Sequence, residues 1–311
     1  MKNFKFILIP IIFFAVFSLT LIHFKVYKGS SVIVDIPQGS SISSISNMLF
    51  DEGLILNPVL FKTYARLNLS DNKLQAGEYF IDSSQSVYTL NKKLVEGDFY
   101  YRKLTLLPGS TLKTILNLAN SSSLVNDLDS IDITLEEGIF YPDTYYYLKG
   151  ETFSSILFQS HTRWKEISNK LWERRDDDLP YANIMEATTM ASIIEKEGVE
   201  KETIAGVFVN RLKLNMKLQS DPTVIYALGN DFDGDIKRKD LQIDSPYNTY
   251  RYRGLPPGPI SIVSEASLRA ALRPKETDYL YFVSMGNGFH KFSKNLTDHN
   301  KAVLEYQING R

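Results

Sequence analysis

The sequence predicts an α+β protein with an N-terminal transmembrane anchor, a small strand–helix–helix–strand subdomain and a larger mixed α+β domain. Three observations support this division. An apolar run occupies residues 7–24, strand-like alternation and helix-like spacing follow one another in residues 31–98, and longer helical runs mix with short strands from residue 99 onward. The predicted domains are therefore residues 1–28, 31–98 and 99–311.

Residues 1–28 are expected to form a cytoplasmic tip and a single membrane-spanning helix. The run from Ile7 to Phe24 contains no Asp, Glu, Lys or Arg, and a span needs roughly 20 apolar residues. A cleaved signal peptide is the alternative, but no small-x-small cleavage pattern follows the run. Lysines flank both ends of the run, so the two sides differ in positive charge only by the N-terminal amine. Because positive charge favours the cytoplasmic side, this difference weakly favours a cytoplasmic N-terminus. We expect an uncleaved anchor in the cytoplasmic membrane, with the bulk of the chain outside.

Residues 31–98 show the pattern of a small α+β unit. Residues 31–37 alternate as a strand does, and apolar residues at helical spacing follow between Ser41 and Glu52. Pro58 is expected to begin a second helix that ends near Leu67, because proline favours the first helical position. The segment AGEYFID is strand-like, and a third helix is expected to end at Gly97.

Residues 99–311 alternate between short strands and helices. A strand is expected over Phe99–Leu107 and a long helix over Thr152–Trp172. The segment LPPGPI predicts a stiff, extended loop, because proline fixes φ and has no donor N–H. The remaining expected elements are a helix that carries Glu195, a short helix over Ser264–Leu272, a strand over Tyr279–Ser284 and a last helix over Thr297–Gln307.

The composition excludes several functional classes. The 311 residues include 35 basic and 36 acidic side chains and no cysteine. Balanced charge argues against a nucleic-acid partner, which would require a basic patch. Without cysteine there are no disulfides, no thiolate catalysis and no cysteine–metal site. The four histidines form no HExxH or comparable ligand set, so we expect neither a metal nor another cofactor.

Within the stretch from Thr188 to Gly229, the acids Glu195 and Glu197 follow a run of small and apolar residues. Glu195 follows the run MASII, and the residues three, four, seven and eight positions before it are small. A carboxyl group in apolar surroundings keeps its proton to higher pH, as a general acid requires. Glu197 lies on a different face of the same helix, which is also lined by apolar residues. Helical periodicity therefore does not show which of the two residues is the general acid. A solvated helix end, EKEGVEKE, is the alternative interpretation.

Six motifs occur along the chain in a fixed order. They are EGIFYPDTYYY, ASIIEKE, VFVNRL, LQSDPTVIYALG, SPYNTYRYRGLPPGPI and FSKNLTDHN. Together they resemble the motifs of the YceG-like family of endolytic murein transglycosylases (MltG). The resemblance covers most of the chain from about Ser31 and is densest from Glu137 onward. One mild departure is Asp298 in DHN, where relatives often carry a different residue.

The resemblance implies a membrane-anchored lytic transglycosylase that cuts nascent peptidoglycan strands internally. It implies that Glu195, the first acid of ASIIEKE, protonates the leaving oxygen and then deprotonates the C6 hydroxyl of the same N-acetylmuramic acid. The product would carry a 1,6-anhydro end, and strand elongation would stop. It further implies that residues 31–98 are LysM-like, acting as a glycan-binding module or only as a spacer. The expected partners are glycan strands, the inner membrane and peptidoglycan synthases.

Polar and aromatic side chains after Glu195 are expected to position the glycan and tune the acid. The predicted substrate-binding residues are Asn210, Gln219, Ser220, Asp221, Tyr226, Asn248 and Tyr250. Asp221 could instead be the N-cap of a helix that begins at Pro222. Tyr226 could instead be a core residue, and Glu137 could cap a helix or a turn.

Two other functional classes remain open at this level. A water-using muramidase would need a second carboxylate opposite Glu195, for which Asp221 or Glu197 could serve. A non-catalytic glycan-binding scaffold of the synthesis machinery would need no acid at all, and Glu195 would then be a surface residue. The ends of the product distinguish the first class, and the absence of cleavage distinguishes the second.

Overall fold

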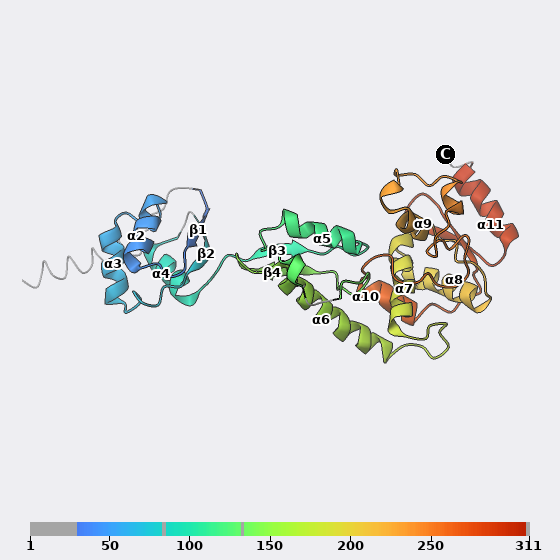
Figure 1. The fold of residues 1–311 in the computed structure, drawn as a ribbon, viewed down its shortest axis with the longest axis horizontal. Coiled ribbons are helices and arrows are strands. Elements are labelled where there is room, and N and C mark those ends of the chain that lie inside the picture. Colours follow the sequence, from blue (N-terminus) through green and yellow to red (C-terminus); the bar gives the residue numbers. More distant parts are fainter. Residues whose placement is uncertain (1–29, 83–84, 132–133, 309–311) are drawn as a thin grey trace, which may run out of the picture. The chain divides into compact units, whose positions relative to one another are not determined.

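A computed structural model describes residues 30–82, 85–131 and 134–308 (Figure 1). The chain divides into two compact units, one formed by residues 30–103 with 146–151 and one by residues 104–145 with 152–308. The first unit thus extends beyond the predicted boundary at residue 98 and includes a short later segment. The predicted anchor in residues 1–28 lies outside the described residues. Within the described ranges, no helix is both long enough and apolar enough to cross a bilayer.

The first unit is organised as the alternation and spacing predict. It contains β1 (Val32–Ile36), α2 (Ile42–Asp51), α3 (Pro58–Leu67), β2 (Gly77–Ile81) and α4 (Val87–Glu96). Strand β1 pairs antiparallel with β2, with Val34 opposite Tyr79. The strand–helix–helix–strand order is therefore confirmed, while the likeness to a LysM module stays a prediction.

Local capping explains where the helices of this unit begin. The side chains of Ser41 and Asn57 accept hydrogen bonds from the first turns of α2 and α3, and Ser86 forms a capping box with Thr89 at the start of α4. Helix α4 ends at Gly97, whose φ of 68° lies in the left-handed region. The helices and strands enclose one apolar core of their own.

The chain passes between the units at two paired strands, β3 (Arg102–Thr105) and β4 (Thr144–Tyr147). The helices of the second unit are α5 (Leu112–Ser121), α6 (Phe153–Trp172), α7 (Ile184–Glu197), α8 (Lys201–Lys213), α9 (Asp221–Leu228), α10 (Glu265–Leu272) and α11 (Leu296–Val303). Its hairpin is formed by β5 (Tyr281–Ser284) and β6 (His290–Ser293), and its short turns are η1 (Leu128–Ser130), η2 (Gly229–Asp231), η3 (Asp240–Gln242) and the π-helical η4 (Leu304–Ile308). The predicted long helix and short helix are confirmed, whereas both predicted strands are shorter than expected.

Helix α7 is the central element of the second unit. Every residue from Ala187 to Ile194 is buried, and α6, α8, α9 and α10 all pack against this helix (Figure 1). A helix buried on every side lies in the interior, and the hydroxyls of Thr188, Thr189 and Ser192 donate to carbonyl oxygens of the same helix. The two acidic residues at its C-terminal end are therefore carried to the edge of the core rather than onto a free surface.

Two glycines allow close packing beside α7. Gly198 ends the helix, and a Cβ added there would lie 2.7 Å from His290 Cε1. Gly206 lies inside α8, where a Cβ would lie 2.4 Å from the carbonyl oxygen of Lys275. Helix-interior glycine is unfavourable by roughly 1 kcal/mol relative to alanine, so the backbone contact at Gly206 explains why α8 carries a glycine.

Candidate active site

The last turn of α7 directs Glu195 and Glu197 towards different neighbours. Residues two positions apart on a helix point to different sides. Glu195 reaches the N-terminus of α10, whereas Glu197 reaches the N-terminus of α9. Each carboxyl group consequently lies in its own environment, and the two environments differ in the protonation state that they favour.

Glu195 is held as a carboxylate by donors from two helices. Its Oε2 accepts hydrogen bonds from the backbone N of Ser264 at 2.9 Å and from Ser264 Oγ at 2.5 Å. Its Oε1 lies 3.0 Å from Lys201 Nζ, and its side chain is 10% exposed. Burial alone would raise the pKa of Glu195, but hydrogen bonds from Ser264, Ser267 and Lys201 outweigh it and lower that pKa. The expectation that apolar surroundings raise the pKa of Glu195 is therefore wrong.

Glu197 has the opposite character. Its Oε1 accepts a hydrogen bond of 2.5 Å from Ser220 Oγ. Burial raises the pKa of Glu197 to about 7, and the Asp221 carboxylate adds to the rise, while Ser220 and Arg211 oppose it. The residue nevertheless keeps part of its surface open to solvent. A carboxyl group with a pKa near neutral pH can both give and take a proton, as a general acid and base must.

Three of the predicted substrate-binding residues surround Glu197. Ser220 is the N-cap residue of α9, and its backbone N donates to Thr249 Oγ1 at 3.0 Å. Asp221 is the first residue of α9 rather than its N-cap, so that alternative is wrong. Tyr250 Oη donates to Asp221 Oδ1 at 2.5 Å, and burial followed by this hydrogen bond raises the pKa of Tyr250. These groups form one polar cluster beside the raised-pKa carboxyl.

Gln219 adjoins this cluster through its backbone. It has a left-handed φ of 50°, and its N donates to the carbonyl oxygen of Thr249 at 3.2 Å. Its side chain is exposed. The exposed side-chain amide of Gln219 is next to Ser220 in the sequence and is free to contact a ligand. A ligand contact at Gln219 therefore stays a prediction.

The two predicted asparagines have structural roles. Asn210 Nδ2 donates to the carbonyl oxygens of Thr277 at 2.6 Å and Tyr279 at 3.1 Å. Asn248 is completely buried, donates to two backbone carbonyls and accepts from the N of Tyr250 at 2.9 Å. A ligand contact at Asn248 stays a prediction, and the burial and internal hydrogen bonds of its side chain argue against it. The amide donors of Asn210 are likewise occupied.

Both acids and the polar cluster lie within a part of the chain that matches a known protein family. Residues 34–305 match the model of the YceG-like family. The chain belongs to the YceG-like family.

Named relatives of this YceG-like chain are similar over most of its length. A protein of Bacillus subtilis (strain 168) named endolytic murein transglycosylase is 32% identical, over 89% of this chain and 85% of the relative. A protein of the same name from Streptococcus pneumoniae serotype 2 (strain D39 / NCTC 7466) is 30% identical, over 88% of this chain but only 58% of the relative. A crystal structure of a YceG-like protein from Listeria monocytogenes matches with a TM-score of 0.53 and 32% identity, over 88% of this chain and 98% of the other.

Tyr226 and Glu137 form a second, separate contact in this YceG-like unit. Tyr226 Oη donates to Glu137 Oε2 at 3.2 Å, while the backbone N of Leu112 donates to Oε1 at 2.8 Å. Leu112 is the first residue of α5, so Glu137 serves as a cap for that helix, one of the two roles considered for it. Tyr226 is half-buried and its ring centroid lies 4.9 Å from that of Tyr247. Tyr226 thus combines a packed ring with a satisfied hydroxyl.

Sequence reasoning missed several residues that shape both acids. Lys201 Nζ links Glu195 to Ser267 Oγ, at 3.0 and 2.7 Å. Arg211 is buried and donates to the carbonyl oxygen of Leu218, just before Ser220. Only Ser264 had a readable signal, because a serine before a helical run is typical of an N-cap. In the part of the chain that the structure describes, no three His, Asp or Glu side chains gather as a metal site would require.

Proposed function

We propose that this YceG-like protein is an endolytic murein transglycosylase that acts on the glycan strands of peptidoglycan. The relatives named above carry this activity in their names. The single observation that carries the chemical part of the proposal is the Glu197 carboxyl, which accepts a hydrogen bond from Ser220 and whose pKa burial raises to about 7. We further propose that it cleaves the bond between N-acetylmuramic acid and N-acetylglucosamine and leaves a 1,6-anhydro end.

In the proposed reaction, one carboxyl group serves twice. Protonated Glu197 gives its proton to the glycosidic oxygen as the C1–O bond of the muramic acid breaks. The C6 hydroxyl oxygen of the same sugar bonds to C1, and the Glu197 carboxylate takes the hydroxyl proton. No water is consumed, and Glu197 returns to its protonated state. The internal hydroxyl is already held close to C1, which favours it over a free nucleophile.

We propose Glu197 rather than Glu195 as the general acid and base, because the two carboxyl groups have different hydrogen-bond and ion-pair partners. Glu195 is the ion-pair partner of Lys201, and its lowered pKa leaves it without a proton at neutral pH. Glu197 has a pKa close to neutrality and can exist in both forms during turnover. We propose that Glu195 positions the end of α7 by joining it to α10, and that it acts on the reaction only through that placement.

The polar cluster beside Glu197 is proposed to orient and tune it. Ser220 fixes the carboxyl through its hydroxyl. Asp221 raises the pKa of Glu197 by its negative charge. Tyr250 binds Asp221 and presents an aromatic ring next to the same cluster, and aromatic rings suit the apolar faces of sugars. Gln219 is proposed as an additional glycan contact.

A water-using muramidase remains the second candidate because a second carboxylate, Asp221, lies beside Glu197. Its influence on the pKa of Glu197 places the two charges within electrostatic range. In such an enzyme Asp221 would activate water. Its hydrogen bond to Tyr250 occupies one carboxylate oxygen, so that oxygen is not free to activate water, which favours the first candidate.

We also propose that the protein works at the outer face of the cytoplasmic membrane. The support is the apolar run over residues 7–24 in the sequence, next to a short link to β1. Such attachment would keep the site near newly made strands, and cleavage there would terminate their elongation. Peptidoglycan synthases are the expected neighbours in that setting. The glycan-binding role of the first unit belongs to the same set of proposals.

The decisive test uses the full chain purified in detergent, together with its Glu197→Gln and Glu195→Gln variants. Each is incubated with purified glycan strands, and the product ends are identified by mass spectrometry. New ends lighter by one water, formed by the parent but not by Glu197→Gln, are the expected result. Reducing ends would establish a hydrolase instead. Intact strands in every reaction, with all proteins folded, would favour a glycan-binding scaffold.

A further inference from the structure

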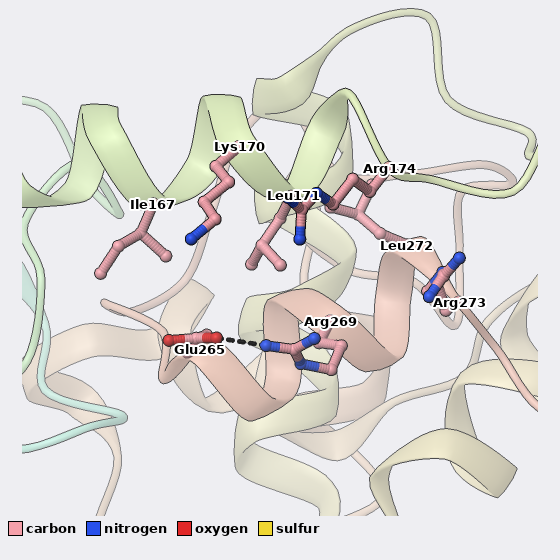
Figure 2. Close-up of a pocket in the computed structure, with 8 residues that line it drawn as sticks. All are labelled: Ile167, Lys170, Leu171, Arg174, Glu265, Arg269, Leu272 and Arg273. Carbon is pink, nitrogen blue, oxygen red and sulfur yellow. Dashed lines mark hydrogen bonds and ion pairs between the residues drawn. The ribbon is translucent and has the colours of Figure 1, made fainter.

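A small pocket lies between α6 and α10 and is lined by four cationic side chains (Figure 2). Its lining consists of Ile167, Lys170, Leu171, Arg174, Glu265, Arg269, Leu272 and Arg273. Helix α10 presents Ser267 to Lys201 and its Arg269 side to this pocket. The pocket is therefore separate from the contacts that Glu195 and Glu197 make.

The charges in this pocket do not cancel. Arg269 is paired with Glu265, and Arg273 Nε lies 3.7 Å from Asp176 Oδ1. Lys170 and Arg174 make no ion pair with any residue that the structure describes. Figure 2 shows the Lys170 ammonium extending from α6 towards α10. Two uncompensated cations thus border one pocket, and this arrangement attracts an anion.

The size and lining of the pocket restrict what that anion can be. The cavity volume is about 170 Å³, whereas sites for drug-sized ligands occupy roughly 300–1,000 Å³. A disaccharide is therefore too large, and a phosphate or diphosphate group is of suitable size. Ile167, Leu171 and Leu272 supply the apolar part of the lining, and the four cationic side chains are exposed, so that their charged groups are accessible to an anion from solution. Guanidinium groups match phosphate oxygens with two parallel hydrogen bonds.

We propose that the pocket formed by Lys170, Arg174, Arg269 and Arg273 binds a phosphate-bearing group. Lys170 and Arg174 supply the charge for binding, and Arg269 and Arg273 supply guanidinium donors from the facing side. The phosphate can belong to a diphosphate ester, as on a lipid-carried sugar chain, or to a phosphate monoester. A singly charged carboxylate fits less well, because it neutralises only one of the two uncompensated cations.

Isothermal titration calorimetry of the full chain in detergent, at neutral pH and low salt, tests this site. The probes are inorganic pyrophosphate, sn-glycerol 3-phosphate and acetate. We expect saturable binding of at least one phosphate probe and none of acetate at the same concentrations. The tighter of the two phosphate probes indicates whether the natural source is a diphosphate or a monoester. Acetate that binds as tightly as both phosphates would overturn the assignment of the ligand class.

A charge-matched pair of double variants distinguishes a built site from a general positive field. Lys170→Gln with Arg174→Gln should weaken binding of the phosphate probe at least about tenfold, because charge-assisted hydrogen bonds are lost. Lys291→Gln with Arg238→Gln removes the same charge from exposed positions elsewhere and should leave the affinity within about twofold. Equal weakening by both pairs, or no saturable binding to the parent chain, would overturn the proposal.

Discussion

Ser220 donates its hydroxyl hydrogen to the carboxylate of Glu197 at 2.5 Å, although the two residues are 23 positions apart in the sequence. Ser220 is also the N-cap residue of α9, yet its side chain makes no capping hydrogen bond. The hydroxyl is thus used for the acid and not for the helix. The contact of Ser220 with the Glu197 carboxyl is therefore distinct from its position at the start of α9. The effect of Ser220 on the acid and its effect on the helix can be tested independently.

Replacement of Glu197 by glutamine should abolish most of the activity. Loss of a general acid lowers the rate by roughly 10²–10⁴-fold, whereas Glu195→Gln should lower it about tenfold or less. Release of soluble fragments from purified glycan strands measures both rates, with circular dichroism as the control for folding. A fully active Glu197→Gln variant together with an inactive Glu195→Gln variant would instead identify Glu195 as the general acid.

The pH dependence of kcat/KM should follow the proton on Glu197. Because burial raises its pKa to about 7, the protonated form decreases above that pH, and the rate should fall about tenfold per pH unit in the alkaline range. Asp221→Asn removes a negative charge that raises this pKa, so the fall should begin at lower pH. Initial rates across a pH series measure the shift. An unmoved or alkaline-shifted limb in Asp221→Asn would contradict the assignment.

Ser220→Ala should shift the alkaline decrease of kcat/KM to higher pH, opposite to the shift expected for Asp221→Asn. The hydroxyl lowers the pKa of Glu197, so its removal should raise that pKa and extend activity to higher pH, while the loss of orientation lowers the maximal rate about tenfold. Because Ser220 makes no capping hydrogen bond, urea unfolding should show little loss of stability below about pH 7, where Glu197 is protonated, and a larger loss at higher pH, where the hydroxyl stabilises the ionised carboxylate. A large stability change without a pH shift would mean that Ser220 acts only structurally.

Folding stability should also depend on pH through Glu197. A carboxyl whose pKa is raised from 4.5 to about 7 on folding binds its proton more tightly in the folded state. Its contribution is fully present below about pH 4.5 and is lost as the pH rises through 7. The parent chain should therefore lose stability over this window relative to Glu197→Gln, as measured by urea unfolding at several pH values. Parallel profiles for the two proteins would show that the pKa is not raised.

Glu195→Gln should destabilise the fold by about 1–3 kcal/mol at neutral pH, because Lys201 keeps its charge in a mostly buried position without its partner. The pKa of Glu195 is lowered on folding, so its stabilising effect is present above about pH 4.5 and is lost as the pH falls through that lowered pKa. The difference between parent and variant in urea unfolding should therefore shrink in acid. A constant difference across pH would contradict the ion-pair explanation.

Local signals made the helices predictable. Pro58 indicated the start of α3 and Gly97 the end of α4, and the structure places both boundaries there. Such signals depend on residues within one turn of each other. The strand–helix–helix–strand order of residues 31–98 could therefore be derived without any knowledge of distant contacts.

The choice between Glu195 and Glu197 could not be made in that way. Helical periodicity assigns each acid to a face, but the pKa depends on what packs against that face. Ser264, which contacts Glu195, is 69 positions away, and Ser220 is 23 positions from Glu197. Asn248 shows the same limit, because an amide can bind a ligand or the backbone with equal chemical ease. Only the tertiary fold decides between these uses.

Asn248 has a consequence for how the surrounding loop can change. Its side chain binds the carbonyl oxygens of Leu241 and Ile243 and the N of Tyr250, all within a segment that has only one short helical turn. Exposed loops generally accept insertions and deletions. Here a single added or removed residue between Leu241 and Tyr250 would break the hydrogen bonds of Asn248. The Tyr250 hydroxyl would then move away from Asp221. The segment should therefore keep a fixed length wherever the site is kept, with slow amide exchange around Asn248 despite its irregular backbone.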